Sequence, residues 1–132
     1  MDNLEKSELV IAKTLGLLME TGLRNAQLDF VELELDSTYE DFFGTCIEWL
    51  ESEGIIRTRS IAKYSNGNVT IFGPTLTAHG FEIMGRSLMV GGNQITIGEA
   101  VVRTSKETSF YTGLGDLGGG FVGGLLKSLG SG

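Results

Sequence analysis

The sequence predicts an α+β fold, and three features of its 132 residues carry that prediction. The first is the stretch STYEDFFGTCIEWLESEGII at residues 37–56, which has the pattern of a capped helix running into a strand. The second is the pair Asn66-Gly67 between two segments rich in β-branched residues, the strongest short-range signal for a hairpin. The third is a helix entry at Leu76-Thr77, directly after the hairpin.

The length and the distribution of glycine predict one domain with a tail. A chain of this size has room for one domain with a modest core. Its glycines are crowded toward the C-terminal end. We expect residues 1–90 to form the domain, residues 91–108 to connect, and residues 109–132 to form a glycine-rich amphipathic tail.

A first helix is expected to run from the N-terminus to Gly22. Asp2 and Glu5 have the spacing of a capping box, in which side chains satisfy the unpaired N–H groups of the first turn. Apolar residues then recur at helical spacing along one side: Leu4, Val10, Ile11, Leu15, Leu17 and Leu18.

Residues 27–35 fit two patterns. Apolar residues alternate with acidic ones as in a strand, whereas Leu28, Val31 and Leu35 also fit one face of a short helix. We favour the helix, because a short element followed by a turn and a capped helix is the helix-turn-helix arrangement.

The central helix is expected to begin with a capping box of Ser37 and Glu40 and to end at Gly54, which accepts a left-handed conformation. Its apolar side consists of Tyr39, Phe42, Phe43, Cys46, Ile47, Trp49 and Leu50. We expect Phe43 and Trp49 to lie in the core, since both belong to that side.

After the hairpin, Gly73-Pro74 ends the second strand and a closing helix is expected. Thr77 is placed to cap that helix. The residues expected to face inward are Phe81, Met84 and Leu88.

Over about residues 3–89 the chain resembles the winged helix-turn-helix superfamily. The resemblance rests on the helix end at 49–56, on the Asn66-Gly67 hairpin as the wing, and on the entry Leu76-Thr77-x-x-Gly80-Phe81. It implies three helices, a β-hairpin wing and a closing helix. Members of the superfamily serve as transcription regulators, DNA-architectural proteins and protein-interaction modules, so the resemblance implies a fold and leaves the function open.

Charge is distributed unevenly along the chain. The net charge is −7, composed of −10 over residues 1–54 and +3 over the remainder. A domain that binds nucleic acid usually carries a basic footprint, so this distribution lowers the expectation of DNA binding. The lone Cys46 on an apolar face favours a reducing compartment, and we expect a cytoplasmic protein without signal peptide, transit peptide or membrane span.

The sequence offers no constellation of catalytic residues, and we expect no enzyme activity. One histidine and one cysteine cannot build a zinc site, and no serine lies in a nucleophile elbow. The glycines of residues 113–118 match the spacing of a dinucleotide-binding turn, but no strand and no acidic residue follow at the required distance. We therefore expect no metal and no cofactor.

One functional hypothesis is a DNA-binding transcriptional regulator. In it Tyr39 and Thr45 meet the groove, while Arg57, Arg59 and Lys63 hold phosphates. The difficulty is that the charged residues on the solvent side of the helix are all acidic: Glu40, Asp41, Glu48 and Glu51. A simpler interpretation of the two arginines is that they offset carboxylates at the end of the preceding helix.

The preferred hypothesis is a non-enzymatic protein-interaction or oligomerisation module. Its acidic helices face solvent or a basic partner, and its tail docks on a partner protein, a second copy or a lipid interface. Glycine lowers helix propensity, so the tail is expected to need such a surface, although a linker-like end is the alternative. The tail residues expected to make the contact are Leu114, Leu117, Gly119, Phe121, Gly123, Leu125 and Leu129.

Overall fold

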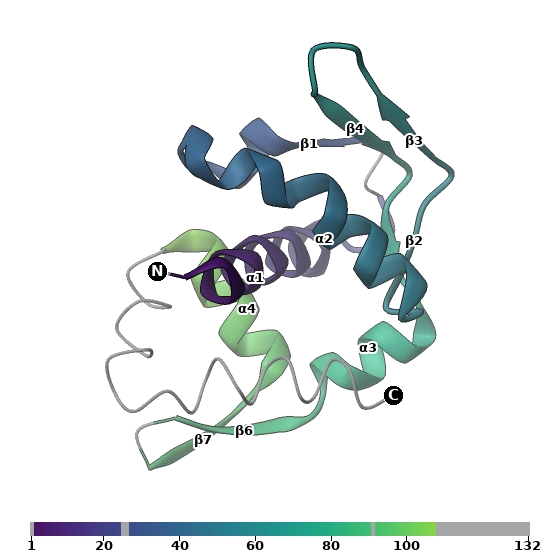
Figure 1. Ribbon diagram of the computed structural model, residues 1–132. Helices are drawn as coiled ribbons and strands as arrows, with labels where there is room; N and C mark the ends of the chain where they lie inside the picture. The colour runs from purple at the N-terminus through teal and green to yellow at the C-terminus, as the bar shows by residue number, and fades with distance from the viewer. Residues whose placement is uncertain (1, 25–26, 91, 108–132) are drawn as a thin grey trace.

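The computed structural model describes residues 2–24, 27–90 and 92–107 and confirms the α+β class (Figure 1). The elements follow one another in this order: α1 (Asn3–Thr21), β1 (Gln27–Asp29), the 3₁₀ helices η1 (Phe30–Leu33) and η2 (Ser37–Tyr39), α2 (Glu40–Ser52), β2 (Ile56–Arg57), β3 (Ser60–Lys63), β4 (Val69–Phe72), β5 (Thr75–Leu76), α3 (Ala78–Met84), β6 (Ser87–Val90), β7 (Asn93–Thr96) and α4 (Ile97–Lys106).

Helix α1 lies at the centre, with α2 on one side and α4 on the other (Figure 1). The Asp2 carboxylate accepts from the N–H of Glu5 at 2.8 Å, and Gly22 ends the helix with φ +62°. Every residue from Glu8 to Gly16 is buried, because neighbouring elements cover this helix on more than one side. Leu4, in contrast, is 56% exposed, so the first turn projects beyond the core.

Residues 27–35 do not form the short α-helix that the sequence analysis favoured. They form β1, followed by η1 and Glu34 in the left-handed region at φ +56°. Leu28 pairs with Ile71 of β4, and both side chains are buried. The open edge of β4 thus supplies hydrogen-bond partners, and strand pairing overrides the weak helical pattern.

Helix α2 begins at Glu40 and not directly after Ser37, because residues Ser37–Tyr39 form the 3₁₀ helix η2. The residue that caps this region is Asp36, whose carboxylate accepts from the N–H of Thr38 at 2.9 Å, and a 3₁₀ turn precedes Glu40. Phe43 is buried, as expected, whereas Trp49 is only partly buried. Gly54 follows the end of the helix with φ +74°, which confirms its stop signal.

The hairpin forms where the sequence predicted it. Strands β3 and β4 pair antiparallel, with Gly67 in the connecting loop at φ +90°, and β1 adds to β4 in the order β1-β4-β3. The N–H of Asn68 donates to the Asn66 side chain at 3.0 Å and fixes the loop. The hairpin projects from the body beside α2 (Figure 1).

The closing helix α3 is shorter than predicted. Thr77 caps it, accepting from the N–H of Gly80 at 2.9 Å, and Met84 is buried as expected. Leu88 is buried too, but as a residue of β6. Phe81 was expected to face inward and is 42% exposed, because the inward side of α3 is formed by Gly80, Ile83 and Met84.

Residues 91–108, expected to connect, supply β7 and α4, and α4 packs on α1. A Cβ at Gly16 would overlap the Val101 carbonyl, so glycine permits the close approach of the two helices. The buried Lys13 ammonium donates to the Ser105 carbonyl at 3.3 Å. Burial lowers the pKa of Lys13, and the Glu34 carboxylate opposes that effect.

Candidate functional site

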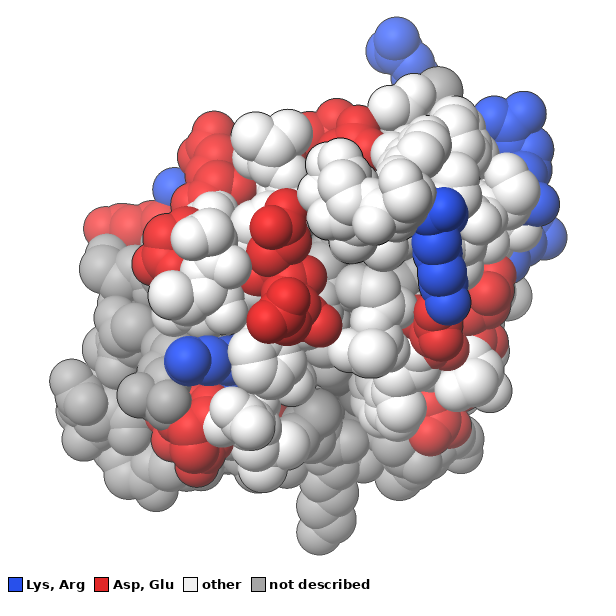
Figure 2. All heavy atoms as spheres, turned by 45° about the horizontal axis from the view of Figure 1, so that its top comes forward, with Lys and Arg blue, Asp and Glu red and all other residues white. Residues whose placement is uncertain are grey.

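The face formed by α2 and the β3–β4 hairpin is acidic along the helix. The carboxylates expected on the solvent side are all exposed: Glu40, Asp41, Glu48 and Glu51. Figure 2 shows this side of the molecule, with Asp and Glu at its left, centre and right and most Lys and Arg near its upper and right edges. Acidic residues therefore extend across the face, and at its right they lie beside basic residues.

Two of these carboxylates contact residues that follow α2 in the chain, Thr58 and Lys63. Glu48 forms an ion pair with Lys63 of β3, with 2.7 Å between Oε1 and Nζ. Glu51 accepts from both the N–H and the hydroxyl of Thr58, at 3.1 and 2.7 Å. The carboxylates thus lie beside the strand that was expected to hold phosphate.

Arg57 and Arg59 are exposed, and within the described residues neither forms an ion pair. The Arg59 side chain lies directly over Gly73. The interpretation that these arginines offset the acidic end of α2 receives no support from contacts, because the contacts of Glu51 are with Thr58. Two arginines therefore remain available at the edge of the acidic face.

The two residues expected to meet a DNA groove lie on other elements than the basic residues. Tyr39 lies in η2, is partly buried and packs on the core. Thr45 is exposed on α2, but its hydroxyl donates to the Phe42 carbonyl at 3.2 Å and it borders a groove toward α1. Lys63 lies on the hairpin beside Glu48.

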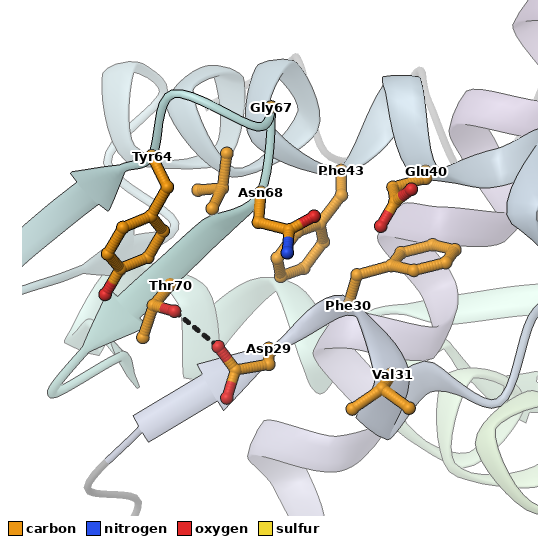
Figure 3. A pocket seen from close by; sticks show the side chains of 10 residues that line it. Asp29, Phe30, Val31, Glu40, Phe43, Tyr64, Gly67, Asn68 and Thr70 are labelled. Carbon is orange, nitrogen blue, oxygen red and sulfur yellow. Dashed lines mark hydrogen bonds between the residues drawn. The ribbon is translucent and has the colours of Figure 1, made fainter.

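A pocket of about 240 Å³ lies between η1, the first turn of α2 and the hairpin (Figure 3). Aromatic rings contribute much of its lining, and the rings of Phe30 and Phe43 meet edge to face with 5.9 Å between centroids. Two carboxylates, from Asp29 and Glu40, also line it, and no lysine or arginine does. The pocket thus combines aromatic and negative groups.

The Asp29 carboxylate is fixed from two sides. Thr70 of β4 donates to one oxygen at 2.6 Å, drawn as a dashed line in Figure 3, and the Gln27 amide donates to the other at 2.8 Å. The pKa of Glu32 is raised, chiefly by partial burial and to a lesser extent by the nearby Asp29 charge. Negative charge is therefore concentrated beside the pocket.

A second hollow of about 400 Å³ runs between α1 and α2 and was not foreseen from the sequence. Its lining carries no charge and consists of Leu4, Ser7, Ile11, Thr45, Cys46 and Trp49. Burial raises the pKa of the Cys46 thiol to about 11, and its Sγ donates to the Ser7 carbonyl at 3.6 Å. We call this hollow the α1–α2 groove; the exposed Leu4 and the incomplete burial of Trp49 mark its rim.

The described residues hold no group of three or more His, Cys, Asp or Glu side chains arranged for a metal ion. None of the helices in these ranges is long and apolar enough to cross a membrane. The expected tail contacts, from Leu114 to Leu129, lie outside the described residues.

A scan against protein-family models, a search of curated proteins and a search of solved structures each returned no match. The chemistry of the chain's own surfaces therefore has to indicate the class of protein.

Proposed function

We propose that this chain is a non-enzymatic winged-helix module that works by binding a protein partner in the cytoplasm. Support for the winged helix comes from the order of α1, β1, α2 and the β3–β4 hairpin, with β1 completing the sheet. The chain departs from the family pattern at residues 27–35, where strand and 3₁₀ turn replace a helix. The free, buried Cys46 supports a reducing compartment.

The observation that carries the proposal is the acidic solvent face of α2. A helix that enters a DNA groove must lie among phosphates, and each carboxylate there is repelled or has to be neutralised. Lys63 offsets one of the four carboxylates, since it forms an ion pair with Glu48, whereas Glu40 and Asp41 remain exposed on the same helix. The same face attracts lysine and arginine side chains of a protein, and electrostatic complementarity of this kind favours encounter and specificity.

The pocket in Figure 3 extends that surface. Its volume of about 240 Å³ and its aromatic lining suit one long basic side chain, whose charge would lie near Asp29 and Glu40. Tyr64, 50% exposed, and Val31, 77% exposed, border the opening and offer apolar contact. We infer that the partner presents a basic segment. The glycine-rich tail is the second part of the proposal, and it docks on an apolar surface.

The test is charge reversal at one of two matched glutamates. Glu48 pairs with Lys63 at 2.7 Å, and Glu99 on α4 pairs with Arg103 at 2.7 Å, and both are exposed. Binding of a labelled arginine-rich peptide to the full chain is measured by fluorescence anisotropy at about 150 mM salt. Glu48→Lys should weaken binding and Glu99→Lys should not; equal effects of the two substitutions would contradict a specific acidic face.

A DNA-binding regulator remains the second candidate, favoured by the exposed Arg57 and Arg59. In a mobility shift with random duplex at about 150 mM salt, we expect no complex at micromolar protein, because phosphate contacts supply most non-specific affinity. Tight, sequence-selective binding that Arg57→Ala and Arg59→Ala both weaken, with a reduced salt dependence, would replace the first proposal by the second.

A further inference from the structure

We propose that the tail, residues 109–132, covers the α1–α2 groove of its own molecule. This inference rests on the proposed docking role of the tail and adds the surface on which it docks. The groove is apolar, has the volume of an ordinary ligand site and lies apart from the hairpin and the pocket of Figure 3.

The chemistry of the groove matches that of the tail. No charged side chain lines the groove, and the tail contains one acidic and one basic residue, Asp116 and Lys127, which cancel. In helical geometry five of the apolar residues of the tail form one stripe: Leu114, Leu117, Phe121, Leu125 and Leu129. Gly119 and Gly123 fall on the opposite side of that helix, so the apolar stripe and the glycine side are separate surfaces.

The end of α4 brings the tail to the correct helix. The Ser105 hydroxyl donates to Glu20 at 2.8 Å, and the Ser105 carbonyl accepts from Lys13, so the chain leaves α4 beside α1. From Lys13 to Leu4 the helix extends about 14 Å at 1.5 Å per residue, and the groove lies on the side of α1 away from α4, so the tail has to pass around a helix about 10 Å in diameter. Residues 107–113, if extended, span roughly 24 Å, which suffices to bring Leu114 along and around α1 to the groove.

Intramolecular docking has a physical advantage over the alternatives. A segment tethered this closely has an effective concentration on the order of millimolar, so even a weak contact is occupied. A tail rich in glycine does not hold a helix alone, and an apolar surface within reach supplies the missing burial. The tail therefore needs no second molecule to find a surface of matching chemistry.

The groove carries its own reporters, because Cys46 and Trp49 are the single cysteine and the single tryptophan of the chain. The experiment measures acrylamide quenching of Trp49 and the rate of Cys46 labelling by a thiol reagent in the full-length protein. Leu117→Asp with Phe121→Asp places two charges in the stripe and should increase both signals several-fold. The control Gly120→Asp with Lys127→Gln lowers the net charge by the same two units on the side of that helix away from the stripe, and it should leave both signals near the original values.

A second pair of variants alters residues in and near α1 and leaves the tail unchanged. Leu4→Asp should increase Trp49 quenching, whereas Leu23→Asp, at the far end of α1 where the leucine is also exposed, should not. Light scattering must show a monomer throughout. Unchanged accessibility in the stripe variant would overturn the inference, as would protection that appears only with a dimeric mass or only after addition of anionic vesicles.

These outcomes are separate from those of the proposed function. The peptide-binding experiment concerns the α2–hairpin face, and the tail variants alter no residue there. Failure of tail docking with intact peptide binding overturns only the groove assignment, and the reverse result overturns only the acidic partner face.

Discussion

Replacement of Phe43 by alanine tests the packing that joins α2 to the sheet. Phe43 is 1% exposed and meets the ring of Phe30 edge to face. Truncation of a buried phenylalanine costs about 3 to 5 kcal/mol, and the lost ring pair accounts for about 0.5 to 1.5 kcal/mol of interaction. Because Phe43 also lines the pocket of Figure 3, water can enter the space left behind, and we expect a value near the lower limit, about 3 kcal/mol.

The assay is equilibrium unfolding in urea, followed by the fluorescence of the single tryptophan. The midpoint should fall while the slope stays constant, which identifies a change in stability rather than in the denatured state. Phe81→Ala is the matched control, since Phe81 is 42% exposed, and it should cost less than about 1 kcal/mol. A loss below about 1 kcal/mol for Phe43→Ala, or equal losses for the two variants, would refute the assigned packing.

Two further variants test helix contact and pH dependence. Gly16→Ala should destabilise the protein in thermal unfolding, because a Cβ there would overlap the Val101 carbonyl. Gly44→Ala is the control: the nearest atom to its Cβ lies at 3.4 Å, so the substitution should be neutral or stabilising by up to about 1 kcal/mol. A larger loss of stability for Gly44→Ala than for Gly16→Ala would contradict the α1–α4 contact. The fold raises the pKa of Cys46 from its ordinary value of 9.0 to about 11, so its contribution to stability is present below pH 9 and is lost as pH rises toward 11. The loss in the free energy of unfolding amounts to at most about 3 kcal/mol. In urea titrations between pH 8 and 11, Cys46→Ala should remove this part of the pH dependence of stability. Identical pH profiles for the two proteins would show that the thiol is not desolvated.

Local signals in the sequence were sufficient wherever one residue type decides the backbone. Gly54 and Gly67 adopt the positive φ for which glycine is suited, and Asp2 and Thr77 cap the helices that follow them. The sequence also identified the buried Phe43 and the acidic solvent face of α2, because helical periodicity separates the two sides.

The candidate surfaces were only partly foreseeable. Glu48 and Lys63 are fifteen positions apart in the chain, and only pairing of the hairpin beside α2 brings them to 2.7 Å. The α1–α2 groove depends on how two helices are spaced, which no pattern within either helix records. The pocket in Figure 3 likewise takes its walls from β1, η1, α2 and the β3–β4 hairpin.

By itself, the sequence determined the α+β class, the hairpin, the caps at Asp2 and Thr77, the stops at Gly22 and Gly54 and the sign of charge on each segment, because these depend on neighbours within a few positions. Tertiary structure alone decided the state of residues 27–35, the exposure of Phe81 and the integration of residues 92–107. The physical reason is that Leu28 gains a strand partner in β4, that Ile83 and Met84 occupy the inward side of α3, and that α4 is held by the side of α1 that Gly16 leaves open.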